Sequence, residues 1–216
     1  MTALSKISNA LLTTLITTLF LSCMQKSNTD KEPSIKDSLN TVAGNEYATV
    51  DRSPVDISYY PPSYPQDRMN NNSTTVTPVA RIIYSRPHKM NRIIFSDSEK
   101  SICQFGKLWR LGANEATEIE FFQPVIINDK NIPAGRYGMY CIPFADKWVL
   151  AISSNLYNWG LDIHPEKDII RIEVPVQKQQ PVIEDFTMVF APASYGADLQ
   201  IAWDDVKTVL PVMFSK

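Results

Sequence analysis

The sequence has little glycine and almost no histidine. Seven glycines in 216 residues leave little material for loops that cradle phosphate, and Gly106-Lys107 lacks the earlier glycine of a P-loop. His88 and His164 stand 76 positions apart, without a His-x-x-x-His or Cys-x-x-Cys spacing anywhere in the chain. Catalytic zinc sites combine several nitrogen or sulfur ligands, so the pattern predicts neither a transition metal nor another cofactor.

Positive charge is not in excess either. Lysine and arginine total 21 against 23 aspartates and glutamates, the formal net charge is −2, and no basic stripe is interleaved with aromatic residues. This composition argues against a nucleic-acid partner. The sequence contains no Gly-x-Ser-x-Gly motif that would indicate a hydrolase. A catalytic Ser-His-Asp or Cys-His arrangement, formed by residues that are distant in the sequence, remains an alternative.

Long hydrophobic runs are also missing. The apolar stretch Ala10–Leu21 follows Lys6 and includes four threonines. A membrane-spanning helix needs about 20 apolar residues, so the stretch fits the hydrophobic region of an export signal. Phe20-Leu21-Ser22-Cys23 resembles the lipobox of bacterial lipoproteins, especially those of Bacteroidota. We expect residues 1–22 to be a lipoprotein signal peptide and Cys23 to be lipidated; an ordinary secretory signal with an incidental cysteine is the alternative.

Residues 23–46 are polar and predict a flexible tether between a lipid anchor and a folded domain. Within this tether, Asp37-Ser38-Leu39 resembles the short O-glycosylation motif of exported Bacteroidota proteins, and an unmodified linker is the alternative. Acidic residues soon after a lipidated cysteine can direct surface export, but Lys26 interrupts the stretch here. We therefore expect an outer-membrane protein that faces the periplasm and meets the membrane through Cys23.

Residues 47–216 have the length of one domain and the composition of a β protein. The chain contains 15 prolines and 10% aromatic residues, and no long stretch keeps an apolar stripe at helical spacing. Apolar and polar residues alternate with period two in Thr117–Phe121, Trp148–Ile152, Asp168–Val174, Phe186–Phe190 and Leu199–Trp203. The pattern predicts an all-β, single-domain antiparallel β-sandwich or flattened barrel of 8–10 strands, whose strand order it leaves open.

Turn residues separate these strands. Asn128-Asp129-Lys130-Asn131, followed by Pro133-Ala134-Gly135, is expected to join Val125–Ile127 to Arg136–Ile142. Ser194-Tyr195-Gly196 is expected to join the strands that contain Phe186 and Leu199.

Several motifs together resemble a known family. They are Ser53-Pro54, Ile83-Tyr84-Ser85-Arg86-Pro87, Arg92-Ile93-Ile94-Phe95, Trp109-Arg110-Leu111-Gly112-Ala113-Asn114-Glu115-Ala116-Thr117, Pro133-Ala134-Gly135-Arg136-Tyr137, and Ile142-Pro143 ahead of Trp148. From about Asp51 to Val212 the chain resembles a Bacteroidota family catalogued as domain of unknown function 2911. The resemblance implies a compact, mostly β, exported domain without an established activity. Cys103, Cys141 and Gly138-Met139-Tyr140 depart from the family pattern.

The densest group of polar side chains lies between residues 110 and 117. Arg110, Asn114 and Glu115 form one candidate ligand-binding set, in which Glu115 would anchor a ligand or act as a general base. In the alternative, Arg110 pairs with Glu115 and Asn114 satisfies loop amides, so that the group only fixes a turn.

Arg86, His88 and Trp159 complete the candidate ligand-binding residues. Arg86-Pro87-His88 follows a strand, where binding residues often lie, although His88 also suits an ordinary surface position. Trp159 precedes a glycine in a loop; an exposed indole would indicate binding and a buried one a core anchor. A platform that stacks on sugars could be formed by Tyr59, Tyr60, Tyr64, Tyr140, Tyr157 and Trp159, with simple packing as the alternative. The first three stand in a proline-rich run that is expected to be extended.

Cys103 and Cys141 are the thiols that remain after lipidation of Cys23. An even pair in an oxidising envelope suggests a disulfide, whereas the apolar alternation around Cys141 suggests two buried free thiols. Both interpretations stay open.

These observations predict a lipid-anchored envelope protein that serves as a ligand-binding or structural accessory module, with a glycan or another envelope ligand as partner. One alternative is an envelope hydrolase that uses Glu115 or His88 for proton transfer. Another is an interaction subunit of an outer-membrane assembly, which would expose an apolar patch.

Overall fold

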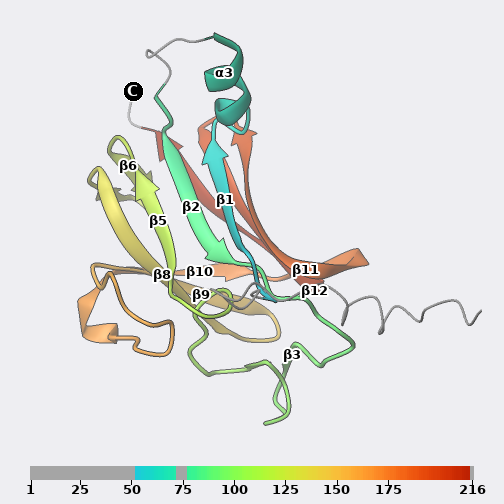
Figure 1. Ribbon diagram of the computed structural model, residues 1–216. Helices are drawn as coiled ribbons and strands as arrows, with labels where there is room; N and C mark the ends of the chain where they lie inside the picture. Colours follow the sequence, from blue (N-terminus) through green and yellow to red (C-terminus); the bar gives the residue numbers. More distant parts are fainter. Residues whose placement is uncertain (1–51, 72–76, 215–216) are drawn as a thin grey trace, which may run out of the picture. The chain divides into compact units, whose positions relative to one another are not determined.

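The computed structural model describes residues 52–71 and 77–214, which contain two main antiparallel sheets (Figure 1). The larger sheet has six strands in the order β1-β2-β5-β8-β9-β10, and every neighbouring pair is antiparallel. Its strands are β1 (Val55–Tyr60), β2 (Ala80–Ser85), β5 (Thr117–Phe121), β8 (Gly135–Pro143), β9 (Lys147–Ser153) and β10 (Asp168–Pro175).

The second sheet has the order β11-β12-β6-β7 and is built around one long hairpin. Its strands are β11 (Gln177–Ala193), β12 (Gly196–Phe214), β6 (Val125–Ile127) and β7 (Lys130–Ile132). Three further elements lie outside the two sheets: the short parallel pair β3 (Phe95–Ser96) and β4 (Cys103–Gln104), helix α3 (Tyr64–Asn71), and the 3-10 turn η1 (Pro165–Lys167). Figure 1 places α3 at one end of the sheets and β3 at the other.

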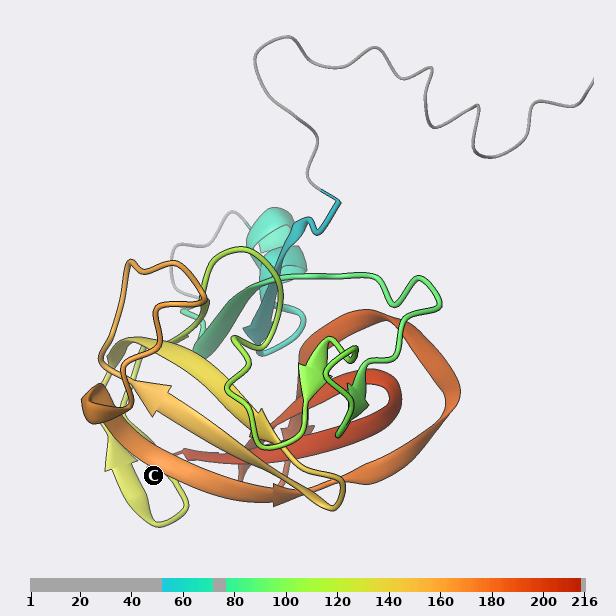
Figure 2. The same ribbon diagram turned by 90° about the horizontal axis from the view of Figure 1, so that it is seen from below.

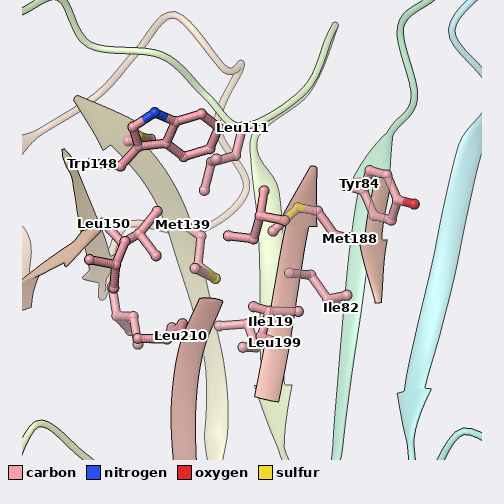
Figure 3. Close-up of a cluster of buried hydrophobic side chains, with 14 of the residues drawn as sticks. Ile82, Tyr84, Leu111, Ile119, Met139, Trp148, Leu150, Met188, Leu199 and Leu210 are labelled. Atoms are coloured by element: carbon pink, nitrogen blue, oxygen red, sulfur yellow. The ribbon is translucent and has the colours of Figure 1, made fainter. Parts of the chain in front are cut away.

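The core lies between the two sheets because each strand sends alternate residues inward. Figure 3 shows inward-facing side chains from both sheets meeting there. The larger sheet contributes Ile82, Ile119, Met139 and Leu150, and the second sheet contributes Met188, Leu199 and Leu210. Burying each of these side chains is worth about 1.5–3 kcal/mol, so the period-two pattern supplies the main driving force for the sandwich.

An aromatic cluster fills one end of this core. Trp109 stacks on Trp203 with ring centroids 6.0 Å apart, and meets Trp148 edge-on at 5.7 Å. Phe95, from β3, lies 5.0 Å from Trp148. Trp109 precedes β5 in a loop, so the aromatic cluster ties that loop to both sheets.

The structure confirms the predicted sandwich, and its sheets stay open rather than closing into a barrel. The described residues hold twelve strands, more than the predicted 8–10. The excess comes from β3, β4 and β7, which have two or three residues and are too short to display an alternation. The two long strands β11 and β12 also extend far beyond the segments that the pattern indicated.

One predicted connection and one predicted extended run differ from the structure. The segment after β6 contains β7, which pairs with β6 through a turn at Asn128 and Asp129, whose φ angles are 47° and 61°. β6 and β8 therefore belong to different sheets. In the proline-rich run, the chain turns after Tyr60 and enters α3 at Tyr64, where the Ser63 hydroxyl donates a hydrogen bond of 2.7 Å to Asp67.

The predicted signal peptide, the tether and Cys23 lie outside the described residues. All described residues belong to one compact unit, Asp51–Lys216. Within the part of the chain that the structure describes, no helix has the length and hydropathy needed to cross a membrane.

Candidate functional site

Four of the six predicted binding residues come together at one edge of the larger sheet. Glu115, in the loop before β5, forms an isolated antiparallel bridge with Trp159, in the loop between β9 and β10. Gly160 packs directly on Arg110 and on the backbone oxygen of Asn114. Figure 2 shows the β9–β10 loop, in orange, at this edge of the molecule.

Hydrogen bonds to its own carbonyls fix the loop before β5. The Thr117 hydroxyl donates to the Leu111 carbonyl at 2.7 Å, and the Trp109 indole donates to the Gly112 carbonyl at 3.3 Å. Gly112 has a φ of 154° and lies against the Ser85 carbonyl, which a Cβ would approach to 2.7 Å. The loop is therefore held by buried contacts beneath it, which leaves Asn114 and Glu115 on its outer side.

The β9–β10 loop is cross-linked by polar contacts. The side-chain amides of Asn155 and Asn158 both donate to the Asp162 carbonyl. The Lys167 ammonium donates to Asn155 at 2.9 Å, and the Asp162 amide donates to the Trp159 carbonyl at 2.8 Å. These bonds hold the backbone of the loop in place.

Three large apolar side chains of this loop are exposed to solvent. Tyr157 is 83% exposed, Trp159 55% and Leu161 76%. The guanidinium of Arg136, which pairs with Glu118 on the outer face of the sheet, lies 5.4 Å from the centre of the Tyr157 ring. We refer to Tyr157, Trp159 and Leu161 as the Trp159 surface.

A small pocket lies beside the Trp159 surface. Its volume is about 20 Å³, which is space for about one water molecule. Arg110, Tyr140, Asn158 and His164 are among its lining residues. Arg110 Nε and Asn158 Oδ1, atoms of two of these lining residues, are buried without a hydrogen-bond partner in residues 52–71 and 77–214.

The electrostatics of the pocket are set by Arg110. Burial lowers the pKa of this guanidinium. Because the reference pKa of arginine exceeds 12, Arg110 stays charged at neutral pH. A partly desolvated cation with an unpaired N–H is suited to receive a hydroxyl, carbonyl or anionic oxygen.

Glu115 does not form the ion pair with Arg110 that the structural alternative required. Its side chain is exposed, and no described residue holds its carboxylate in an ion pair. A general base needs an orienting partner and a substrate within hydrogen-bonding reach. The geometry at Glu115 supplies neither an orienting partner nor an enclosed reaction site.

Arg86 and His88 lie away from this pocket. Arg86 pairs with Asp56 of β1 at 3.1 Å, and its backbone amide donates to the Pro54 carbonyl at 2.9 Å. His88 pairs with Asp185 of β11. Both residues therefore tie the chain between β2 and β3 to neighbouring strands.

Cys103 and Cys141 are free and buried. Desolvation raises the pKa of both thiols well above the ordinary value, so they stay protonated and poorly nucleophilic. Among the described residues, no group of three or more His, Cys, Asp or Glu side chains is placed to hold a metal ion.

Sequence reasoning considered Tyr140 of β8 for stacking on sugars but missed Arg136 of the same strand. Arg136 and Tyr140 alternate with the inward residues of β8 and therefore face outward, under the β9–β10 loop. The Tyr140 hydroxyl donates to Asp168 at 2.6 Å, which holds it below the loop. The alternation in β8 could have placed these residues on the outer face, but nothing local indicates which loop covers them.

Comparisons with known proteins identify a family but no characterised relative. No curated protein and no solved structure matches the chain. Residues 63–212, more than half of the chain, match the family described as "Protein of unknown function (DUF2911)". The chain therefore belongs to the DUF2911 family.

Proposed function

We propose that this protein is a lipid-anchored module of the bacterial cell envelope that binds a glycan at the Trp159 surface. The observation that carries the proposal is the half-exposed indole of Trp159, held on a hydrogen-bonded loop beside the unpaired Arg110 Nε and Asn158 Oδ1. An aromatic face next to fixed polar groups matches the two surfaces of a sugar ring, apolar C–H faces and polar hydroxyl edges.

Exposure of three large apolar side chains on one loop is unfavourable unless a partner covers them. Here the loop is stabilised by side-chain amides and Lys167 rather than by burial of Trp159. The aromatic rings of Tyr157 and Trp159 therefore stay exposed and accessible to a ligand.

The same geometry favours binding over hydrolysis. The pocket of about 20 Å³ admits one hydroxyl-sized group but no reacting sugar and water together. Glu115, the predicted catalytic carboxylate, is exposed beside Trp159 and suits a contact with a ligand hydroxyl.

The lipobox-like sequence Phe20-Leu21-Ser22-Cys23 supports the envelope role, because a module held by lipid and a polar tether would reach glycans near the membrane. Metabolic labelling with radioactive palmitate tests it: the chain incorporates label and the Cys23→Ser variant does not. Fractionation of outer membranes with protease protection then tests the periplasm-facing location. Labelling of the Cys23→Ser variant, or none of the wild type, contradicts the anchor.

Binding is tested with the full chain in detergent on immobilised envelope polysaccharides and oligosaccharides. Trp159→Ala should weaken retention by about tenfold or more, the effect of removing a central aromatic contact. Arg110→Gln should weaken it by a similar factor by removing the charged donor. Tyr195→Ala, an exposed aromatic in the β11–β12 turn, is the matched control and should bind normally.

A glycan retained equally by wild type and Trp159→Ala would show that the Trp159 surface is not the binding site. If no glycan is retained while a protein partner is captured only by chains with Trp159 intact, the surface is a protein-docking site instead, and the proposal is wrong.

A further inference from the structure

We propose that the groove between α3 and the ends of β1, β2 and β5 is a second binding site, for a small ring-bearing carboxylate. We call it the α3 groove and define it by its lining residues, Tyr59, Tyr64, Arg68, Thr77, Pro78, Arg81 and Phe122. This site shares no lining residue with the Arg110 pocket and does not depend on the glycan proposal.

The size of the α3 groove fits a small molecule. Its volume is about 310 Å³, at the lower end of the range of about 300–1,000 Å³ found for ligand pockets. The Arg110 pocket, at about 20 Å³, is far smaller. The α3 groove therefore has room for a whole ring-sized ligand.

Aromatic side chains form the walls of the groove. The rings of Tyr59 and Tyr64 are 5.0 Å apart and tilted by 40°, so they present two inclined faces rather than a closed stack. Phe122, which follows β5, is 36% exposed. Such a wall favours a flat ring or the apolar face of a sugar.

The charges of the groove have one sign. Arg68 and Arg81 line it, and none of its lining residues is acidic. Arg81 is oriented from below by Glu120 at 2.6 Å, and its guanidinium lies 5.8 Å from the centre of the Phe122 ring. Arg81, which Glu120 holds in place, and Arg68 together favour a carboxylate as the ligand, because a carboxylate accepts paired N–H donors.

The backbone holds the groove in shape. The Val79 amide donates to the Tyr60 carbonyl at 2.8 Å, and the Phe122 amide donates to the Val79 carbonyl at 2.9 Å. These bonds join the ends of three strands, while the Ser63 hydroxyl bonded to Asp67 fixes the first turn of α3. Although burial of Arg81 lowers its pKa, hydrogen bonds with Tyr59 and Glu120 raise it overall, which keeps the groove cationic.

The α3 groove and the Trp159 surface are distinct in space. Figure 1 shows α3 at the top of the sheets and the orange β9–β10 loop at the lower left. A ligand in the groove would therefore leave the Trp159 surface free, and the two proposals fail independently.

The test measures binding of two carboxylates and their neutral counterparts to the full chain in detergent by isothermal titration calorimetry. The pairs are glucuronate against glucose, and 4-hydroxybenzoate against 4-hydroxybenzyl alcohol. At least one acid should bind, its neutral counterpart should bind about fivefold or more weakly, and affinity should fall with added salt. Binding of glucuronate indicates a sugar acid as the ligand, and binding of 4-hydroxybenzoate indicates an aromatic acid.

Two variants locate the binding. Arg68→Gln, on the exposed side of α3, should weaken the acid about fivefold or more. Tyr64→Ala should weaken the acid and its neutral counterpart alike, because it removes ring stacking. Arg52→Gln, an exposed arginine before the opposite end of β1, and Trp159→Ala are the controls and should bind like wild type.

The proposal is overturned if neither acid binds at millimolar concentration, or if Arg68→Gln binds the acid as tightly as wild type. Loss of acid binding in Trp159→Ala would also overturn it, because the ligand would then lie on the Trp159 surface.

Discussion

Gly160 packs so closely against Arg110 that a side chain at position 160 has no room: a Cβ there would lie 2.1 Å from Arg110 Cδ and 2.8 Å from the Asn114 backbone oxygen. The contact joins the loop before β5 to the loop after β9. It therefore determines where the Trp159 surface stands relative to the Arg110 pocket.

Gly160→Ala should force these two loops apart, because part of the clash is with backbone that has little freedom to move. We expect the free energy of unfolding, measured in urea, to fall by about 1–3 kcal/mol. Glycan retention should fall as well. Leu161→Ala, next in the chain and 76% exposed, is the control and should change stability by no more than about 0.5 kcal/mol. An unchanged urea midpoint for Gly160→Ala would mean that the two loops do not pack as described.

Cys103 and Cys141 should be inert in the folded protein. Both thiols are buried, and desolvation raises their pKa well above the ordinary value, so thiolate is scarce at pH 8. Iodoacetamide followed by mass spectrometry should find neither cysteine alkylated in the native chain and both alkylated in guanidinium. Rapid alkylation of either one in the native chain, or a disulfide between them, would contradict the structure.

Tyr84 should make stability sensitive to alkaline pH. Burial, followed by the nearby Asp56 carboxylate, raises its pKa from 10.0 to about 12. Between these values the folded state keeps the phenolic proton and the unfolded state loses it. The free energy of unfolding therefore falls as pH rises, by about 1.4 kcal/mol per pH unit from this tyrosine, and its contribution is fully present below pH 10.

Tyr84→Phe removes this titration, so its unfolding free energy should fall less steeply than that of wild type between pH 10 and pH 12. Guanidinium melts at pH 9, 10, 11 and 12 measure the difference. Parallel curves for the two proteins would show that the Tyr84 hydroxyl is not buried.

Tryptophan fluorescence should separate the exposed indole from the buried ones. Trp109, Trp148 and Trp203 are 7%, 1% and 0% exposed, whereas Trp159 is 55% exposed. Acrylamide should quench one component of the wild-type emission readily, and Trp159→Phe should lose that component and shift the remaining emission to shorter wavelength. Trp203→Phe is the matched control and should keep the readily quenched component.

Much of the sandwich follows from local pattern. Thr117–Phe121 is strand β5 with the predicted bounds, and Ile119 is buried while Glu118 lies on the outer face. The turn at Ser194 and Tyr195 joins β11 to β12 as expected. These predictions were accurate because alternation and turn chemistry act over a few residues.

The candidate site was only partly predictable. Arg110, Asn114 and Glu115 were grouped by their positions in the sequence, but the bridge between Glu115 and Trp159 joins segments 44 residues apart. Arg86 lies beside Asp56 of β1 instead, and His88 lies beside Asp185 of β11, because these strands pass next to them. No local signal specifies such pairings.

The sequence by itself determined that the chain forms strands and which face of each strand is apolar; an export signal in residues 1–22 and a tether in residues 23–46 stay predictions. The tertiary structure decided which loops meet: it brought Trp159 to Glu115 and Gly160 to Arg110, and it placed Arg68 of α3 in one groove with Arg81 of β2. The physical reason is the distance along the sequence over which each kind of interaction acts. Backbone preference and alternation act between neighbours, whereas a binding site is assembled by burial and hydrogen bonding between segments whose proximity depends on the whole sheet order.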